Sequence, residues 1–436
     1  MKDPEKIVTD IVVVGSGAAG ATLAKELAQT GRAVTLVERG RDSTWPVGKI
    51  FSLMTLYDHS LMPPFIPKAK EGSYLVRGVC TGGCTTIFGG NAYLPPPWLK
   101  EEYDIDLANE AQEAMEEIGI GVPPKEYYEA WRQAQRFKEA AGEVGISVVP
   151  QLKFIYPGKC LPSCDHCPFG CEKGARWSAR EFVKKAADSG AKVLVQTDVR
   201  EVIIDGNHAV GVKSKGPKGA VDVYADKVVL AAGGIGTPII LQRSGIGEAG
   251  DGLTVDPSWG VYGITKESWE SGGTFAFSCE ETVESAGFMV SNVGASVASF
   301  VRLSTAPLKA VLHPSQFKKV FGTFVKISDS GQGRVYDNGS ISKPFNEEDE
   351  EKINKGIELA KKILIKGGCD PNSFFISEPF GSHYCGTAAI DRVVDRNLET
   401  GVEKLYVCDT SVLPRSPGRP PALTAIALGK WLAKRL

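Results

Sequence analysis

The chain has 436 residues, of which 42% are hydrophobic and 23% are charged. That length suffices for two structural regions with substantial cores. Its 50 Lys and Arg nearly balance its 52 Asp and Glu, so no basic excess indicates a nucleic-acid partner. No run of 18 apolar residues occurs, and the N-terminus enters the first strand almost at once. We therefore expect a cytoplasmic protein without a transmembrane segment.

The chain begins with a strand, a glycine loop and a helix. Residues 11–14 are apolar and β-branched, which is typical of a strand buried on both faces of a parallel sheet. Gly15, Gly17 and Gly20 follow at the spacing of a dinucleotide-binding loop, and a helix is expected over 22–27. The glycines permit a tight turn, close approach of backbone amides to a pyrophosphate, and close packing of the helix on the strand. The helix N-terminus supplies partial positive charge to the phosphates.

A second strand is expected over 34–37, and it ends at an acidic residue. Glu38 follows that strand, where a carboxylate can bind ribose hydroxyls. Because a carboxylate would repel a 2′-phosphate, the predicted ligand is NAD or FAD. Two later buried strands, over 227–230 and over 405–408 with Asp409 at its end, favour FAD. This order of elements is similar to that of large FAD-dependent oxidoreductases.

The segments between these strands differ in composition. Residues 101–145 have helical composition, 192–231 contain strand-like runs, 270–335 suggest sheet, and 347–366 are predicted to form a charged amphipathic helix. We predict an α/β protein with a discontinuous Rossmann-like FAD-binding domain and a smaller α+β substrate domain built on an antiparallel sheet. The expected segments are 1–100, 185–250 and 380–436 for the FAD-binding domain, 101–184 for a helical insertion, and 251–379 for the substrate-binding domain.

One loop in the helical insertion, residues 160–171, concentrates thiols. It carries four cysteines, Cys160, Cys164, Cys167 and Cys171, together with Pro and Gly. Four ligands on one short loop are nearer to the ferredoxin pattern than to paired zinc knuckles, so we predict an iron–sulfur cluster, [4Fe–4S] or [3Fe–4S]. Zinc and free or structural thiols are the alternatives. Because a cluster passes electrons one at a time, its presence favours a dehydrogenase over an oxidase.

Four segments in chain order together resemble the glucose–methanol–choline (GMC) oxidoreductase family. The first is the glycine loop at 15–20, and the second, 77–91, is similar to the family's R-G-x-x-x-G-G-S-S-x-x-N. The third, 231–247, is close to A-G-x-x-x-T-P followed by S-G-I-G. The fourth begins at His383 in an H-x-x-G-T context and runs to Thr424.

The resemblance implies an FAD-dependent enzyme that oxidises an alcohol or sugar hydroxyl. The hydroxyl would lose its proton to His383 while its carbon gives hydride to flavin N5, and a mostly neutral imidazole suits that role at pH 7. Asn91 would place an amide near the reactive edge of the flavin. The implied cofactor-binding residues are Gly15, Gly17, Ala18, Ala19, Gly20, Glu38, Arg39, Arg77, Gly82, Gly83, Cys84, Asn91, Val199, Ala232, Gly233, Asp409, Pro421, Leu423 and Thr424.

The chain departs from the family at the second active-site position. The family has His or Asn there, whereas this chain has Pro420, which has no polar side chain. His383 therefore works alone or with another polar group such as Asn91 or Arg419. Cys84 also replaces a common Ser, and both changes leave the substrate class open.

The Cys loop and the residues after it also resemble the cluster-bearing FAD-dependent sugar dehydrogenases of the family. We therefore expect electrons to leave FAD through the cluster to a redox partner protein or another one-electron acceptor. Two other functions stay open. The protein could be a reductase acting on a ketone or an activated double bond, or a non-catalytic flavin electron-transfer subunit.

Overall fold

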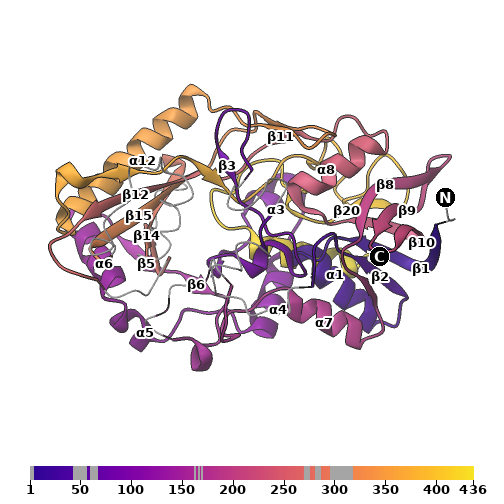
Figure 1. Cartoon of the computed structure of the whole chain (residues 1–436), viewed down its shortest axis with the longest axis horizontal. Helices are drawn as coiled ribbons and strands as arrows, with labels where there is room; N and C mark the ends of the chain where they lie inside the picture. Colours follow the sequence, from indigo (N-terminus) through magenta and orange to yellow (C-terminus); the bar gives the residue numbers. More distant parts are fainter. Residues whose placement is uncertain are drawn as a thin grey trace.

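The computed structural model describes residues 4–42, 56–58, 67–161, 164, 167, 170–269, 275–279, 286–294 and 318–436. They form a mixed α/β fold in which two large sheets lie at opposite ends of the long axis (Figure 1). Within these ranges, no helix has both the length and the apolar composition needed to cross a membrane.

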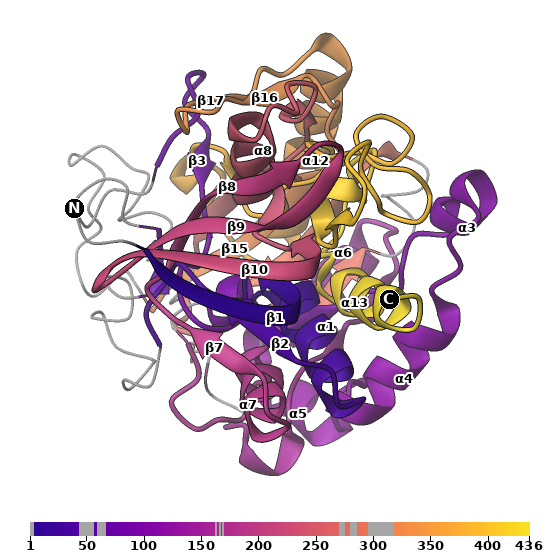
Figure 2. The same cartoon turned by 90° about the vertical axis from the view of Figure 1, so that its right-hand side faces the viewer.

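The first sheet contains the four strands predicted around the glycine loop. Its order is β7 (Lys192–Leu194), β2 (Val34–Val37), β1 (Glu5–Val14), β10 (Gly219–Leu230), β9 (His208–Gly216) and β8 (Asp198–Asp205), with β20 (Leu405–Val407) beside the end of β10 (Figure 2). Strands β7, β2, β1, β10 and β20 are parallel, whereas β9 and β8 extend the sheet in antiparallel fashion. The parallel strands are largely apolar because both faces are covered.

Helices cover this sheet. Helix α1 (Ala18–Gln29) contacts both α7 (Arg180–Asp188) and α13 (Ala422–Ala433), and α13 in turn contacts α4 (Ala108–Ile118). Close approach requires glycine here, since a Cβ on Gly429 of α13 would lie 2.7 Å from the Ala19 carbonyl oxygen of α1. Helix α8 (Gly233–Arg243) follows β10 and contacts β8.

The second sheet is mainly antiparallel. Its order is β3 (Tyr74–Leu75), β19 (Phe380–Gly381), β12 (Ser258–Ile264), β15 (Val320–Ile327), β14 (Phe288–Val293), β13 (Phe277–Cys279) and β5 (Val148–Pro150), with β18 (Phe375–Ile376) beside β12. Helices α12 (Glu347–Lys366) and α6 (Arg132–Glu143) pack on this sheet and on each other, and they share its apolar core. Residues 251–379 supply most of the strands, but β3, β5 and β19 come from outside that range.

Within the part of the chain that the structure describes, shorter elements lie outside the two large sheets, and β11, β16 and β17 form a small sheet of their own. The remaining helices are η1 (Gly83–Thr86), α3 (Trp98–Tyr103), α5 (Lys125–Ala130), η2 (Pro157–Lys159), η5 (Pro371–Ser373) and η6 (Thr410–Val412), and the remaining strands are β4 (Asn91–Ala92), β6 (Leu152–Lys153), β11 (Asp251–Leu253), β16 (Gly333–Val335) and β17 (Ile341–Ser342). The predicted helix over 347–366 is confirmed as α12. It begins at a capping box in which the side chains of Asn346 and Asp349 each accept the other's backbone N–H.

Candidate active site

A cavity of about 620 Å³ extends from the glycine loop of the first sheet to the second sheet. Its walls include the loop after β1, the end of β2, the start of α8, and side chains of β12, β14 and β15. In parallel α/β sheets, ligands bind at the carboxyl ends of the strands, which is where this cavity begins. Its volume is within the range of small-molecule sites.

Most of the predicted site residues line this one cavity. They are Gly15, Gly17, Ala18, Ala19, Glu38, Arg39, Arg77, Gly83, Cys84, Asn91, Val199, Ala232, Gly233, His383, Asp409 and Pro421. Four others do not line it. Gly20 lies in the first turn of α1, Gly82 is the N-cap of η1, and Leu423 and Thr424 are buried in α13. The sequence did not indicate Thr197, Arg200 or Arg243, which also line it.

The glycine loop has the geometry that an approaching phosphate group requires. Gly15 has φ +102°, and a Cβ there would lie 2.3 Å from the carbonyl oxygen of Ala231, so no larger residue fits. Gly17 is the N-cap of α1, and a Cβ there would meet no atom within 4 Å. The first amides of α1 therefore open toward the cavity, as an anion-binding helix N-terminus does.

Two carboxylates hold the loops around the glycines. Glu38 accepts hydrogen bonds from the backbone N–H (3.0 Å) and hydroxyl (2.6 Å) of Ser16. Asp409 accepts from Gly233 N–H (2.8 Å) and the Thr237 hydroxyl (2.6 Å), and burial raises the pKa of Asp409. Because a carboxylate has about four acceptor positions, Glu38 retains capacity for a ligand hydroxyl.

Asn91 lies in β4 on the cavity wall and is buried. Its amide NH₂ donates to the side-chain oxygen of Gln151, and its amide oxygen accepts from the ammonium of Lys153. Burial lowers the pKa of Lys153 to about 8. These two contacts fix the orientation of the Asn91 amide.

His383 faces a buried acid and a buried lysine. Its Nδ1 lies 3.2 Å from Asp256 Oδ2 and 3.5 Å from Lys326 Nζ. With the Asp256 carboxylate as acceptor of the shorter contact, the ring is assigned the tautomer with its proton on Nδ1 and its lone pair on Nε2. Burial and then the charge of Lys326 lower the pKa of His383 below its ordinary 6.5, although Asp256 opposes this. The imidazole is thus neutral at pH 7.

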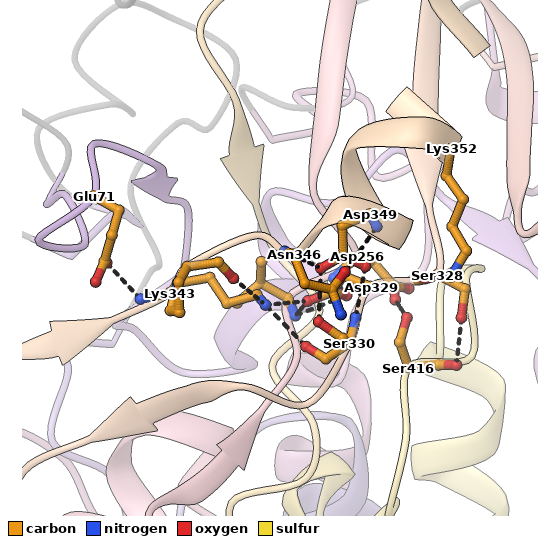
Figure 3. Close-up of polar contacts among 12 residues, drawn as sticks. Glu71, Asp256, Ser328, Asp329, Ser330, Lys343, Asn346, Asp349, Lys352 and Ser416 are labelled. Carbon is orange, nitrogen blue, oxygen red and sulfur yellow. Dashed lines mark hydrogen bonds and ion pairs between the residues drawn. The ribbon is translucent and has the colours of Figure 1, made fainter. Parts of the chain in front are cut away.

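Asp256 is fully buried and has φ +46°, a left-handed conformation that is uncommon outside glycine. Asp329 holds it there by accepting the backbone N–H of Val255 (3.1 Å) and of Asp256 (2.9 Å). The other Asp256 oxygen, Oδ1, accepts the Ser416 hydroxyl and, at 3.2 Å, the Gly418 N–H. Figure 3 shows Asp256 between Asp329 and Ser416.

Asp329 is itself paired with a lysine. Lys343 Nζ lies 3.1 Å from Asp329 Oδ2, and both side chains are completely buried (Figure 3). Burial raises the pKa of Asp329 to about 6, although Lys343 opposes the shift. The pair positions the 255–256 backbone, and through it the carboxylate beside His383.

The sequence alone did not indicate four residues of this site, Asp256, Lys326, Asp329 and Lys343. One signal could have found Lys326, because it stands near the end of an otherwise uncharged, fully buried strand, β15. A charge in such a strand needs a partner or a ligand. Pro420, which stands where the family has His or Asn, lines the cavity.

The Cys loop does not support the predicted iron–sulfur cluster. Cys160, Cys164, Cys167 and Cys171 form no disulfide among the described residues, and burial, followed by the three other thiols, raises the pKa of Cys160 to about 12. The thiols are therefore neighbours. However, no group of three or more His, Cys, Asp or Glu among the described residues is arranged to hold a metal ion. None of the four lines the cavity.

Two models of the GMC oxidoreductase family match the chain, one over residues 9–260 and one over 344–429. The uncharacterized protein MJ1450 of Methanocaldococcus jannaschii is 27% identical over 435 residues, covering 98% of this chain and 99% of that protein. A long-chain-alcohol oxidase (FAO3) of Arabidopsis thaliana is 23% identical over an alignment of 520 residues, which covers all of this chain and 68% of the oxidase.

Two solved structures are similar over nearly the whole chain. Pyridoxine 4-oxidase from Mesorbium loti has a TM-score of 0.74 at 18% identity, covering 98% of this chain and 99% of that structure. Formate oxidase from Aspergillus oryzae has a TM-score of 0.72 at 16% identity, covering 99% and 98%. At 18% and 16% identity, this structural similarity establishes the fold alone.

Proposed function

The chain belongs to the GMC oxidoreductase family, and on that premise we propose that it is an FAD-dependent enzyme that oxidises a small-molecule alcohol beside His383. One observation carries the proposal. A single cavity joins a glycine loop at a helix N-terminus to a neutral imidazole whose proton is held by a carboxylate. The family and its oxidase relatives support the cofactor and the reaction type.

The residues present fit FAD. Gly15 permits the tight turn against Ala231, Gly17 leaves room for a pyrophosphate at the first turn of α1, and Glu38 retains acceptor capacity for a ribose hydroxyl. The parallel strands around this loop and α1 are the arrangement expected of a Rossmann-like fold. When bound, FAD supplies a two-electron acceptor for hydride.

His383 supplies the proton chemistry. Its Nε2 lone pair accepts the hydroxyl proton while the neighbouring C–H bond breaks. Asp256 keeps the ring in the orientation and tautomer that this step needs, and it stabilises the imidazolium that results. Phe324 and Phe380, which also line the cavity, provide an apolar wall that excludes water.

The experiment is anaerobic reduction of the bound flavin by candidate alcohols, followed as loss of its visible absorbance. Denatured protein should release FAD rather than FMN or NAD. We expect His383→Ala to retain FAD but to reduce it ~10²–10⁴-fold more slowly, the usual contribution of a positioned base.

His208 offers a matched control, because it is half exposed on β9, pairs with Glu403 at 2.8 Å and does not line the cavity. His208→Ala should reduce flavin at the wild-type rate. A loss of less than about threefold in His383→Ala would remove that residue from the base role.

The proposed reaction ends with reduced FAD. Transfer of electrons through an iron–sulfur cluster to an external acceptor stays a prediction, since the described cysteines are not arranged around a metal ion. The domain boundaries predicted from the sequence likewise remain proposals.

A further inference from the structure

The second sheet presents one cation to the cavity next to His383. Lys326 lies in β15, opposite Ser258 of β12 and Met289 of β14. Ser291 of β14 lies opposite Phe324 of β15. Phe324 is two residues before Lys326, so its side chain is on the same face of the sheet. All five line the cavity, so three adjacent strands together present an ammonium and two hydroxyls there.

Lys326 lacks the ion pair that a buried lysine normally has. It is 8% exposed, and its Nζ donates to the backbone oxygen of Asp256 at 2.9 Å. Among the described residues, no carboxylate lies within 4.0 Å of that ammonium, whereas Lys343, also buried, has Asp329 at 3.1 Å. The Asp256 carboxylate is already engaged by His383, Ser416 and Gly418.

Ser291 provides a second, independent observation. It is 1% exposed, lines the cavity, and its hydroxyl has no hydrogen-bond partner within the described residues. A buried hydroxyl without a partner costs free energy unless a ligand satisfies it. A buried cation at a cavity wall is compensated in the same way by an anionic ligand.

We propose that the substrate alcohol carries a carboxylate, which Lys326 and Ser291 bind while its hydroxyl lies at His383. Lys326 Nζ lies 3.5 Å from His383 Nδ1, and Nε2, which takes the hydroxyl proton, belongs to the same five-membered ring. The neighbouring carboxylate and hydroxyl of a 2-hydroxy acid can span that separation. Met289 and Phe324 leave an apolar wall for the remainder of the molecule. This inference rests on the proposed oxidation and specifies its substrate class.

The reaction balances with the cofactor already proposed. The O–H bond breaks and its proton goes to His383, while the C–H bond on the same carbon breaks and its electron pair leaves as hydride to oxidised FAD. The C–O bond becomes C=O, so the 2-hydroxy acid becomes a 2-oxo acid. No further oxidant or reductant enters this half-reaction.

Pairs of compounds that differ only in the carboxylate test the substrate class. Lactate and 3-phenyllactate, as each enantiomer, are compared with 1,2-propanediol and 3-phenyl-1,2-propanediol in anaerobic flavin reduction by the holoenzyme. We expect the acids to have the higher second-order rate constant by roughly tenfold or more, the worth of a hydrogen bond to a charged group. Equal or faster reduction by the neutral partners would overturn the proposal.

A binding measurement that needs no turnover separates this proposal from the proposed function. Acetate and oxalate are titrated into the oxidised holoenzyme, and their Kd is read from the change in flavin absorbance. Lys326→Met should weaken binding roughly 10- to 100-fold, and Ser291→Ala less. Lys318→Met, at an exposed lysine before β15, is the matched control and should leave the Kd unchanged.

The outcomes of these experiments distinguish the anion site from the proposed oxidation. Carboxylate binding that depends on Lys326, without flavin reduction by any alcohol, supports the anion site and contradicts the proposed oxidation. Flavin reduction by alcohols with no carboxylate binding, or with binding unaffected in both Lys326→Met and Ser291→Ala, overturns the anion site alone. FAD content and melting temperature of each variant show that it is folded.

Discussion

The proton affinity of His383 is a balance between neighbours of opposite charge. Burial and Lys326 lower its pKa, and Asp256 raises it. A base whose pKa is below 6.5 stays unprotonated over most of the physiological range. With a neutral alcohol as substrate, the rate constant for flavin reduction should therefore fall only on the acid side, below the ordinary histidine pKa.

Replacing Asp256 by Asn removes the charge that favours the imidazolium, so the pKa of His383 should fall further. We expect the acid limb of kcat/KM to move to lower pH, and the plateau to fall at least about tenfold because the ring is less well oriented. The measurement is a pH series of anaerobic flavin reduction.

Lys326→Met tests the opposite charge, because Lys326 and Asp256 both lie beside Nδ1 of His383. It removes a positive charge, so the pKa of His383 should rise and the acid limb should move to higher pH. If the two variants shift the limb in the same direction, at least one of the two charges does not act on His383 as described.

Among single residues, those that stand in short motifs could be predicted from the sequence, whereas those that reach the site only through contacts distant in sequence could not. The glycines and His383 stand in short motifs, so they could be identified without a structure. Asp256 and His383 are 127 residues apart, and nothing in the sequence around Asp256 indicates that contact. Only the fold, through the Asp329–Lys343 pair, brings that carboxylate to the imidazole.

Among the elements, the turn from β1 into α1 has a strict steric requirement at Gly15. Gly15→Ala would combine a positive φ with a Cβ 2.3 Å from a carbonyl oxygen. We expect the variant to lose bound FAD and several degrees of melting temperature. Gly31, which follows α1 at φ +86° with nothing within 4 Å, is the control.

Gly31→Ala carries the same backbone strain without the overlap, so it should cost about 1 kcal/mol and retain FAD. FAD content after gel filtration and thermal unfolding measure both variants. Equal FAD loss in the two would show that strain, rather than the steric contact at Gly15, controls cofactor binding.

The Cys loop is the element on which sequence and structure disagree. If it holds a cluster, anaerobically purified protein should contain about three or four iron atoms per chain and a broad visible absorbance beneath the flavin bands. Cys167→Ser should remove both while substrate still reduces FAD in a single turnover. Protein coloured by flavin alone, with no iron, would contradict the predicted cluster.

Strand and helix positions were predicted well where the chain is strongly patterned. The apolar runs at 34–37 and 227–230 and the charged helix at 347–366 fall within or match the observed elements. Strands β3 and β5 were not predicted, because two or three residues carry too little periodicity. Their place in the second sheet depends on pairing with distant strands.

For the whole molecule, a cavity shared by two sheets couples cofactor binding to global stability. A ligand that binds only the folded state stabilises it by about 2.7 kcal/mol at 100 times its Kd. We expect the urea midpoint of apoprotein to rise with FAD concentration, and His383→Ala to show the same rise. NAD should give no shift.

The contacts made after residue 404 also bear on synthesis of the protein. Strand β20 pairs with β10, Asp409 holds Gly233, Ser416 holds Asp256, and α13 packs on α1. A nascent chain that has not yet released this segment from the ribosome lacks both the contacts that complete the glycine loops and the contact that fixes Asp256 beside His383. Prematurely terminated chains should therefore be inert toward flavin as well as toward alcohol, rather than half-active.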